Sequence, residues 1–321
     1  LSASLILYGF SLIYGLTGQL VFADISAYLL ANSLGSSPVL LLSAILVISG
    51  IGFKISVVPF HSWAPDTYEG APLPITAYLS VSSKATGFVA LIVLLTKVFE
   101  SSGQSWGVIL AIVAGATMTL GNLVALQQTN PVRLLAYSSI SQAGFIIAPL
   151  AVSGITGNYQ DGIFASVTYL IIYAFMNIGA FLSVHLFTNF TKSDNFYEWG
   201  GIAKHSPLTG VLTTVFFFSL AGIPPLGGWF AKFVVFRSLL STGEIIGISL
   251  AIVGAINAVI ALVYYARISK VIWMDELKNP EEEKSFEFQS PLKVVGALTV
   301  LITFVAGIFP GIFSYLGEVS S

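Results

Sequence analysis

Residues 50–87, which read GIGFKISVVPFHSWAPDTYEGAPLPITAYLSVSSKATG, decide the fold class of this chain. The stretch begins in an apolar run that contains Lys54, and Pro59 follows where a membrane-spanning helix would continue. After a polar turn, a second apolar run carries Lys84 near its centre. A lysine at bilayer depth costs at least about 2.5 kcal/mol and is usually tolerated only where it faces a bundle interior or water. Two such lysines, one beside a helix-breaking proline, indicate groups that handle protons.

The composition predicts an all-α polytopic membrane protein. Of the 321 residues, 55% are hydrophobic and only 9% are charged, whereas soluble domains average about 25% charged residues. The apolar runs are uninterrupted over about 20 residues, which is typical of transmembrane helices and not of the short alternating strands of a β-barrel. The net charge of −2 gives no basic footprint for nucleic acid.

The residue types that bind common cofactors are missing or scattered. The chain has no cysteine, so it can ligate no iron–sulfur cluster and form no disulfide. It has no Walker sequence and no glycine-rich dinucleotide motif after a strand, and its three histidines, at 61, 185 and 205, lack metal-ligand spacing. We therefore expect no cofactor or metal in this chain. It begins at Leu1 inside an apolar run without the features of a signal peptide, and we expect it to be part of a longer protein.

The apolar runs predict about nine transmembrane spans in one membrane domain covering residues 1–321. We place them at 2–22, 38–58 (with a short continuation to about 68), 74–97, 105–126, 131–152, 160–189, 207–240, 246–272 and 291–314. Two polar stretches separate spans: 191–206 reads as an interfacial connector and 275–290 as a charged, solvated loop.

Basic residues between the spans fall mainly on one side of the membrane. Eight lie on the side where the chain begins and two on the other, and the positive-inside rule makes the first side cytoplasmic or its organellar equivalent. The eight are Arg133, Lys192, Lys204, Arg267, Lys270, Lys278, Lys284 and Lys293, and the two are Lys97 and Arg237.

The span at 207–240 contains a second predicted break. Its middle reads GIPPLGG at 222–228, and two adjacent prolines remove two backbone donors and clash with the preceding turn. A broken helix at membrane depth is tolerated where it is buried in protein or lines a hydrated cavity. Lys232 follows this break, as Lys54 precedes the break at Pro59.

The two broken spans lie five apart in the predicted order, so they cross the membrane in opposite directions. Interrupted segments at corresponding places in two halves are typical of inverted repeats with a site at the midplane. We therefore expect residues 1–100 to be the C-terminal part of a first, incomplete repeat. Residues 105–273 would form the second repeat, and 291–314 an additional helix.

The candidate site residues are Lys54, Lys84 and Lys232 for proton transfer and His61 as a candidate relay. Lys84 has ten residues of span before it, which puts it ~15 Å from the near boundary, too deep to snorkel comfortably. In a buried site, whether a lysine holds its proton can follow a neighbouring charge. His61 has a side chain that titrates near neutral pH, and it could equally cap carbonyls that Pro59 frees.

Other polar residues have more ordinary interpretations. We expect His185 to be a packed or interfacial histidine, and Asp66 and Glu69 to cap the next helix or bind their own loop. The run YSSIS at 137–141, with Gln142 after it, is a weak signal of a hydrated path, because serines in membrane helices often bond their own backbone. Four further side chains are candidates for contacts between helices, namely Asn177, Asn257, Tyr264 and Tyr265.

Three segments closely resemble the antiporter-like subunit N family of NADH-quinone oxidoreductase (respiratory complex I), including its plastid and cyanobacterial counterparts. They are FKISVVPFHSWAPDTYEGAPLPITAYLSVSSKATGF (53–88), GNLVALQQTNPVRLLAYSSISQAGF (121–145) and SLAGIPPLGGWFAKFVVF (219–236). Cation/proton antiporters and membrane-bound hydrogenases share the architecture but match PFHSWAPDTYEG less well.

The resemblance implies two inverted five-helix repeats with one proton channel each, and lysines of the channels at Lys54, Lys84 and Lys232. It places the acidic partner of Lys54 in a helix upstream of this sequence, and some family members carry a histidine where Gln142 stands. It further implies an integral subunit of a bacterial plasma membrane, or of a thylakoid or organellar inner membrane. The partners would be other membrane subunits of complex I, and quinone, flavin and iron–sulfur clusters would belong to partner subunits.

The sequence predicts a proton-translocating membrane subunit of an NAD(P)H- or ferredoxin-quinone oxidoreductase, with no redox chemistry in the chain itself. The alternative is a stand-alone cation/proton antiporter or a membrane-bound hydrogenase subunit, which would share the broken helices and buried lysines. A purely structural subunit would carry its lysines at helix ends, and Lys84 does not lie at one.

Overall fold

The computed structural model describes residues 1–276 and 290–312, and in these residues it contains helices and no strand. The predicted all-α fold is therefore confirmed for this part of the chain. The longer helices are α1 (Ser2–Thr17), α2 (Phe22–Ala31), α3 (Pro38–Ile55), α4 (Trp63–Gly70), α5 (Leu73–Tyr78), α6 (Lys84–Lys97), α7 (Gly103–Ala125), α8 (Pro131–Thr156), α9 (Tyr159–Thr191), α11 (Pro207–Ala221), α12 (Gly227–Leu240), α13 (Ile245–Met274) and α14 (Ser290–Ile308). The short α10 is Ile202–His205.

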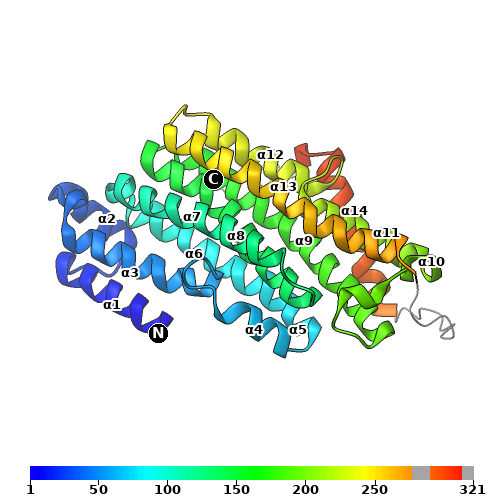
Figure 1. Ribbon diagram of the computed structural model, residues 1–321. Coiled ribbons are helices and arrows are strands. Elements are labelled where there is room, and N and C mark those ends of the chain that lie inside the picture. Colours follow the sequence, from blue (N-terminus) through cyan, green and yellow to red (C-terminus); the bar gives the residue numbers. More distant parts are fainter. Residues whose placement is uncertain (277–289, 313–321) are drawn as a thin grey trace.

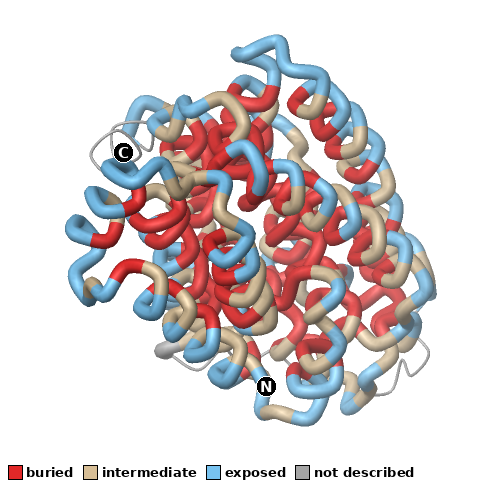
Figure 2. Tube along the Cα trace, turned by 90° about the vertical axis from the view of Figure 1, so that its left-hand side faces the viewer, coloured by how far each residue is buried: buried red, intermediate tan, exposed pale blue. Residues whose placement is uncertain are grey.

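The long helices lie side by side in one elongated bundle, with α1 to α3 at one end and α11 to α14 at the other (Figure 1). Between them lie α8 and α9, and α8 is buried along nearly its whole length. Figure 2 shows buried residues gathered through the middle of the bundle and exposed ones around its outside. Side chains on α8 are therefore placed to reach elements from both ends of the molecule.

Six helices in the described residues are long and apolar enough to cross a membrane, or seven if the bent pair α1 and α2 is one span. Two shorter apolar helices, α11 and Leu292–Ile308 within α14, fall below that length. The predicted count of about nine spans is thus not confirmed. Most of the predicted charged loop at 275–290, with Lys278 and Lys284, lies outside the described residues.

Two predicted spans differ in their internal structure. The span at 2–22 ends earlier, at Thr17, because Gly18 takes the left-handed conformation (φ 66°), and α2 continues at 52° to α1. The span at 74–97 is not one regular helix: a π-helical segment, Leu79–Ser83, separates α5 from α6. Such segments are rare, occur mostly inside α-helices and are frequent at functional sites. This one ends immediately before Lys84.

Both predicted breaks are present. In the span predicted at 38–58, the helix stops at Ile55, and Ser56 turns the chain with a left-handed conformation (φ 60°) before α4 begins at Trp63. In the span predicted at 207–240, the helix stops at Ala221, with Gly222 in the left-handed conformation, and a new helix, α12, begins at Gly227. A cis X-Pro peptide bond lies in each break, at Val58–Pro59 and Pro224–Pro225.

Candidate functional site

Lys232 lies inside the bundle at the second break. It is on the second turn of α12, and only 5% of it is exposed. Its Nζ donates hydrogen bonds to the backbone carbonyls of Ala221 (2.5 Å) and Leu220 (3.2 Å), at the end of α11. The last carbonyls of a helix have no partner within the helix and carry its negative dipole end, so a cation is stabilised there. Lys232 therefore connects the two helices on either side of the break, since it lies on α12 and bonds the last carbonyls of α11.

Lys84 is the most deeply buried charged side chain in the described residues, with 1% exposed. It begins α6 directly after the π-helical segment. Its Nζ donates to the Ser139 backbone oxygen (3.1 Å) and to Ser139 Oγ (2.9 Å) on α8. Neither Lys84 nor Lys232 has a carboxylate partner within residues 1–276 and 290–312. The acceptors of both side chains are neutral oxygen atoms.

Helix α8 connects the two buried lysines. Gln142 lies one turn after Ser139, and its Nε2 donates to the Leu220 carbonyl (3.1 Å). The same carbonyl accepts from Lys232, so Gln142 and Lys232 share one acceptor. The order of polar groups is therefore Lys84, Ser139, Gln142, the Leu220 carbonyl and Lys232. The two lysines lie at the two ends of a short polar track through the core.

Five buried tyrosines surround this track, and we call them the tyrosine cluster: Tyr68, Tyr169, Tyr173, Tyr264 and Tyr265. The hydroxyl of Tyr169 donates to Gln142 Oε1, and that of Tyr265 is hydrogen-bonded to Ser138 Oγ. The hydroxyl of Tyr173 lies 3.5 Å from the Ser80 carbonyl in the π-helical segment. The cluster thus places hydroxyl groups around Ser138, Ser139 and Gln142.

Several buried polar atoms near the track lack a hydrogen-bond partner among the described residues. They include the Tyr68 hydroxyl, Thr168 Oγ1 and Asn177 Oδ1. Buried polar groups in proteins are nearly always paired, and internal water is the usual partner where protein groups do not suffice. Asn177 also donates through Nδ2 to Ser80 Oγ (2.8 Å), which ties α9 to the π-helical segment. An internal water beside any of these atoms would find a hydrogen-bond partner there.

The structure places Lys54 and His61 differently from the two buried lysines. Lys54 is exposed on the last turn of α3, and its Nζ makes no hydrogen bond or ion pair within the described residues. Its aliphatic stem lies beside α6, where a Cβ added to Gly87 would be 3.6 Å from Lys54 Cγ. The same added Cβ would be 2.5 Å from Ile55, so a glycine is needed for this approach. His61 is partly buried in the break, and its Nδ1 has no hydrogen-bond partner among the described residues.

The carboxylates of the PDTYEG turn do not cap the following helix, which corrects the expectation from sequence. Arg133 on α8 pairs through Nη1 with Asp66 (2.8 Å) and Glu69 (2.5 Å). Asn130, which caps α8 by accepting from the backbone of residues 132 and 133, also donates to Glu69 (3.1 Å). The reason is geometric: α4 packs on α8, which brings the acids to a guanidinium that binds carboxylates strongly.

Helix–helix contacts were predicted for four polar residues, and the structure confirms hydrogen bonds between helices for each of them. Asn122 on α7 donates to Asn257 and accepts from the Tyr264 hydroxyl, both on α13. Sequence reasoning missed Ser139 as the partner of Lys84, and it missed Tyr68, Tyr169 and Tyr173. The signal for Ser139 was the YSSIS run. His, Asp and Glu form no group that could hold a metal ion in the described residues.

Comparison with known proteins gives a consistent result. The transmembrane family described as NADH:quinone oxidoreductase/Mrp antiporter matches residues 1–260. The chain is 36% identical to NADH-quinone oxidoreductase subunit N of Desulforamulus reducens, over 97% of this chain and 62% of that protein. It is 42% identical to NAD(P)H-quinone oxidoreductase subunit 2 of Crocosphaera subtropica, over 96% of this chain and 59% of that protein. The chain thus spans about three fifths of the length of these relatives.

Among solved structures, a chain of respiratory complex I from Thermus thermophilus with bound aureothin is similar over all of this chain and 67% of its own length. The TM-score is 0.78 and the sequence identity 25%.

Proposed function

Because the chain belongs to the NADH:quinone oxidoreductase/Mrp antiporter transmembrane family, we propose that it forms the proton-translocating part of an antiporter-like subunit. The subunit would belong to an NAD(P)H- or ferredoxin-quinone oxidoreductase and couple quinone reduction elsewhere in the complex to proton movement. Its partners would be the other membrane subunits, in a bacterial plasma membrane or a thylakoid or organellar inner membrane. Flavin, iron–sulfur clusters and quinone would lie in those partners. The names of the two relatives reported above support this assignment.

One observation carries the proposal: Lys84 and Lys232 are buried at the two ends of the polar track along α8. In such a site, a neighbouring charge decides whether a lysine holds its proton, since a unit charge 4 Å away is worth about 4 kcal/mol at an effective dielectric constant of 20. The ammonium of Lys84 would pass its proton to Ser139 Oγ, the acceptor that it already contacts, while the Ser139 hydroxyl turns from the Ala136 carbonyl and gives its own proton to an ordered water, so that Ser139 stays neutral. The tyrosine cluster and ordered water would carry the proton past Gln142 to Lys232.

Gln142 has a separate role in this proposal. Its amide nitrogen donates to the Leu220 carbonyl and its amide oxygen accepts from Tyr169, so the side chain is held from both sides. An amide neither gains nor loses a proton near neutral pH. Gln142 would therefore position the Leu220 carbonyl and Tyr169 and would not itself be a proton carrier.

The two breaks support a repeat organisation, in which residues 1–100 end the first repeat and 105–273 form the second. Each part contains a helix that stops inside the bundle at a residue with a left-handed conformation, Ser56 or Gly222. Lys54 and His61 would serve the first repeat as proton carrier and relay. In the longer protein, an upstream carboxylate would supply the partner that Lys54 lacks among the described residues.

The test uses the full-length protein in its complex, reconstituted in vesicles. We expect Lys84→Met and Lys232→Met to lower the number of protons moved per electron while electron transfer to quinone continues. The matched control is Lys97→Met, because Lys97 ends the helix that Lys84 begins and is exposed. Unchanged stoichiometry in both buried-lysine variants would refute the proposal. Sodium flux through the isolated protein, independent of quinone reduction, would support the stand-alone antiporter instead.

A further inference from the structure

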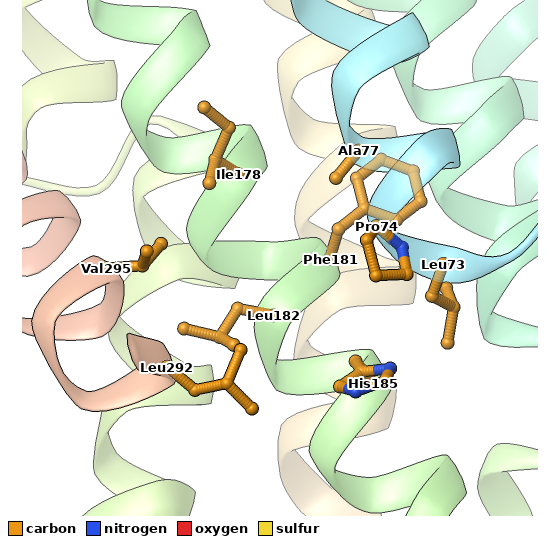
Figure 3. A pocket seen from close by; sticks show the side chains of 9 residues that line it. All are labelled: Leu73, Pro74, Ala77, Ile178, Phe181, Leu182, His185, Leu292 and Val295. Carbon is orange, nitrogen blue, oxygen red and sulfur yellow. The ribbon is translucent and has the colours of Figure 1, made fainter. Parts of the chain in front are cut away.

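An apolar groove opens on the bundle surface between α5, α9 and α14 (Figure 3). Its volume is about 210 Å³. Helix α9 forms the floor with Ile178, Phe181 and Leu182, while α5 and α14 form the walls, with Pro74 on one side and Val295 on the other. Of the residues that line it, His185 alone is polar.

The shape of the groove follows from how the three helices pack. Helix α14 comes close to α9 at Gly296, where an added Cβ would be 3.3 Å from Leu182. Helix α5 packs on α9 from the other side, so a channel remains above α9 between them. From Ile178 to His185 the floor runs seven residues, or about 10 Å at 1.5 Å per residue. An apolar channel of this length and volume fits part of a hydrocarbon chain.

The groove has a polar end with basic side chains. His185 lies at that end, and Asn189, one turn further along α9, has its Nδ2 3.0 Å from His185 Nε2. Lys192 is the residue directly after α9, where the backbone turns with φ 56°, and Lys293 follows Leu292, which lines the groove from α14. Both lysines are exposed, and neither forms an ion pair within the described parts of the chain. Clustered basic residues at the end of membrane helices attract anionic lipid headgroups.

We propose that this groove binds an anionic phospholipid, with one acyl chain along Ile178, Phe181 and Leu182. Its phosphate would lie at His185 and Asn189, between Lys192 and Lys293. The charge at the polar end selects the headgroup, because a purely apolar groove would accept any lipid. The apolar walls hold the acyl chain by van der Waals contact, because the hydrocarbon interior of the bilayer is as apolar as the groove and supplies no hydrophobic driving force.

The test is native mass spectrometry of the full-length protein, stripped of lipid and titrated with phosphatidylglycerol or with phosphatidylcholine of the same acyl chains. We expect tighter binding of phosphatidylglycerol, and at least a tenfold loss in the double variant Lys192→Gln/Lys293→Gln. The weaker binding of phosphatidylcholine should not change in that variant. The matched control is Lys97→Gln, which removes an exposed lysine outside the groove. Equal binding of both lipids, or an unchanged affinity in the double variant, would overturn the headgroup assignment.

A second variant tests the acyl chain. Ile178→Trp fills the floor of the groove and should abolish binding of both lipids, whereas Val259→Trp, on an exposed face of α13, should not. In the assembled complex, a photoreactive residue at position 295 should cross-link to lipid. A cross-link to a neighbouring protein segment would identify a different occupant and overturn the proposal.

Discussion

At the break between α3 and α4 a backbone amide donates to a side chain of another helix, whereas at the break between α11 and α12 a backbone amide donates to a side chain of the same span. At the first break, the Val58 amide donates to Thr117 Oγ1 on α7 (3.0 Å), and Trp63 Nε1 donates to the Phe53 carbonyl (2.7 Å). At the second, the Gly228 amide donates to Ser219 Oγ (3.0 Å), and Lys232 satisfies the Ala221 carbonyl.

This difference separates two roles of a lysine near a broken helix. Lys232 donates to carbonyls that the break leaves without a partner in the helix. Loss of a proton from Lys232 would therefore also weaken the hydrogen bonds at the end of α11. Lys54 fills no such need, because Trp63 serves the carbonyl end of α3. A variant of Lys232 therefore tests structure and proton transfer together, while a variant of Lys54 tests proton transfer with little effect on the fold.

The largest expected effect on stability comes from Gly222→Ala. Gly222 has φ 95°, and an added Cβ would lie 2.7 Å from Lys232 Cδ. The left-handed backbone costs a residue with a Cβ about 1–2 kcal/mol, and displacement of Lys232 adds to this. We expect the free energy of unfolding, measured by denaturant titration in detergent, to fall by about 2 kcal/mol or more.

The control for Gly222→Ala is Ser56→Ala at the other break. Ser56 already holds a left-handed conformation (φ 60°), and its buried Oγ has no partner among the described residues. Removal of that hydroxyl should change stability by less than about 0.5 kcal/mol. Equal losses in the two variants would mean that the close approach of Lys232 to Gly222 does not matter for stability.

A smaller effect is expected from the two hydroxyls that accept from the break amides. Ser219→Ala and Thr117→Val each leave one backbone N–H without its acceptor, at a cost of about 1–3 kcal/mol for a buried donor. The Ser219 variant should lose more stability than the Thr117 variant and less than Gly222→Ala, because the Gly228 amide is buried, whereas the Val58 amide is only partly buried. Thermal unfolding of the two variants in the same detergent measures the difference. A larger loss in Thr117→Val would reverse the comparison.

The burial of Lys84 and Lys232 could be predicted from the sequence, because depth in a membrane can be estimated from the position of a residue in an apolar run. Lys84 lies in the middle of such a run, and Lys232 follows a pair of prolines, and the structure buries both. Both breaks were predicted from proline alone, since a proline removes a backbone donor wherever it stands. The motifs at 53–88, 121–145 and 219–236 predicted the family, and the match over residues 1–260 confirms it.

The polar track could not be predicted, because it depends on contacts between distant segments. Ser139 meets a lysine 55 residues earlier, and Gln142 meets a carbonyl 78 residues later. Helical periodicity gave no help on α8, since nearly all its faces are buried and no polar stripe marks the track. The π-helical segment before Lys84 could not be predicted either, because it contains no proline or glycine. The proton-transfer roles of Lys54, Lys84, Lys232 and His61 stay predictions.

The helices that follow the two breaks, α4 and α12, are also held in the bundle by different contacts. Helix α12 is held by burial of Phe230, Val234 and Val235 against its neighbours. The short α4 buries fewer residues, and the ion pairs of Asp66 and Glu69 with Arg133 attach it to α8. Salt should therefore loosen the first break and leave the second unaffected.

Arg133→Gln tests this last difference and should have the smallest effect. The Arg133 side chain is 29% exposed and that of Asp66 is 76% exposed, so solvent weakens the pairs and we expect a loss of about 0.2–1 kcal/mol. The loss should shrink between about 0.1 M and about 1 M salt, where the Debye length falls from about 10 Å to about 3 Å. Denaturant titration at both salt concentrations measures it, with Lys270→Gln, an exposed lysine without an ion pair in the described residues, as the matched control. A loss that is the same at both salt concentrations would mean that Arg133 holds α4 through packing of its aliphatic stem against α4, because only the charge interaction with Asp66 and Glu69 is screened.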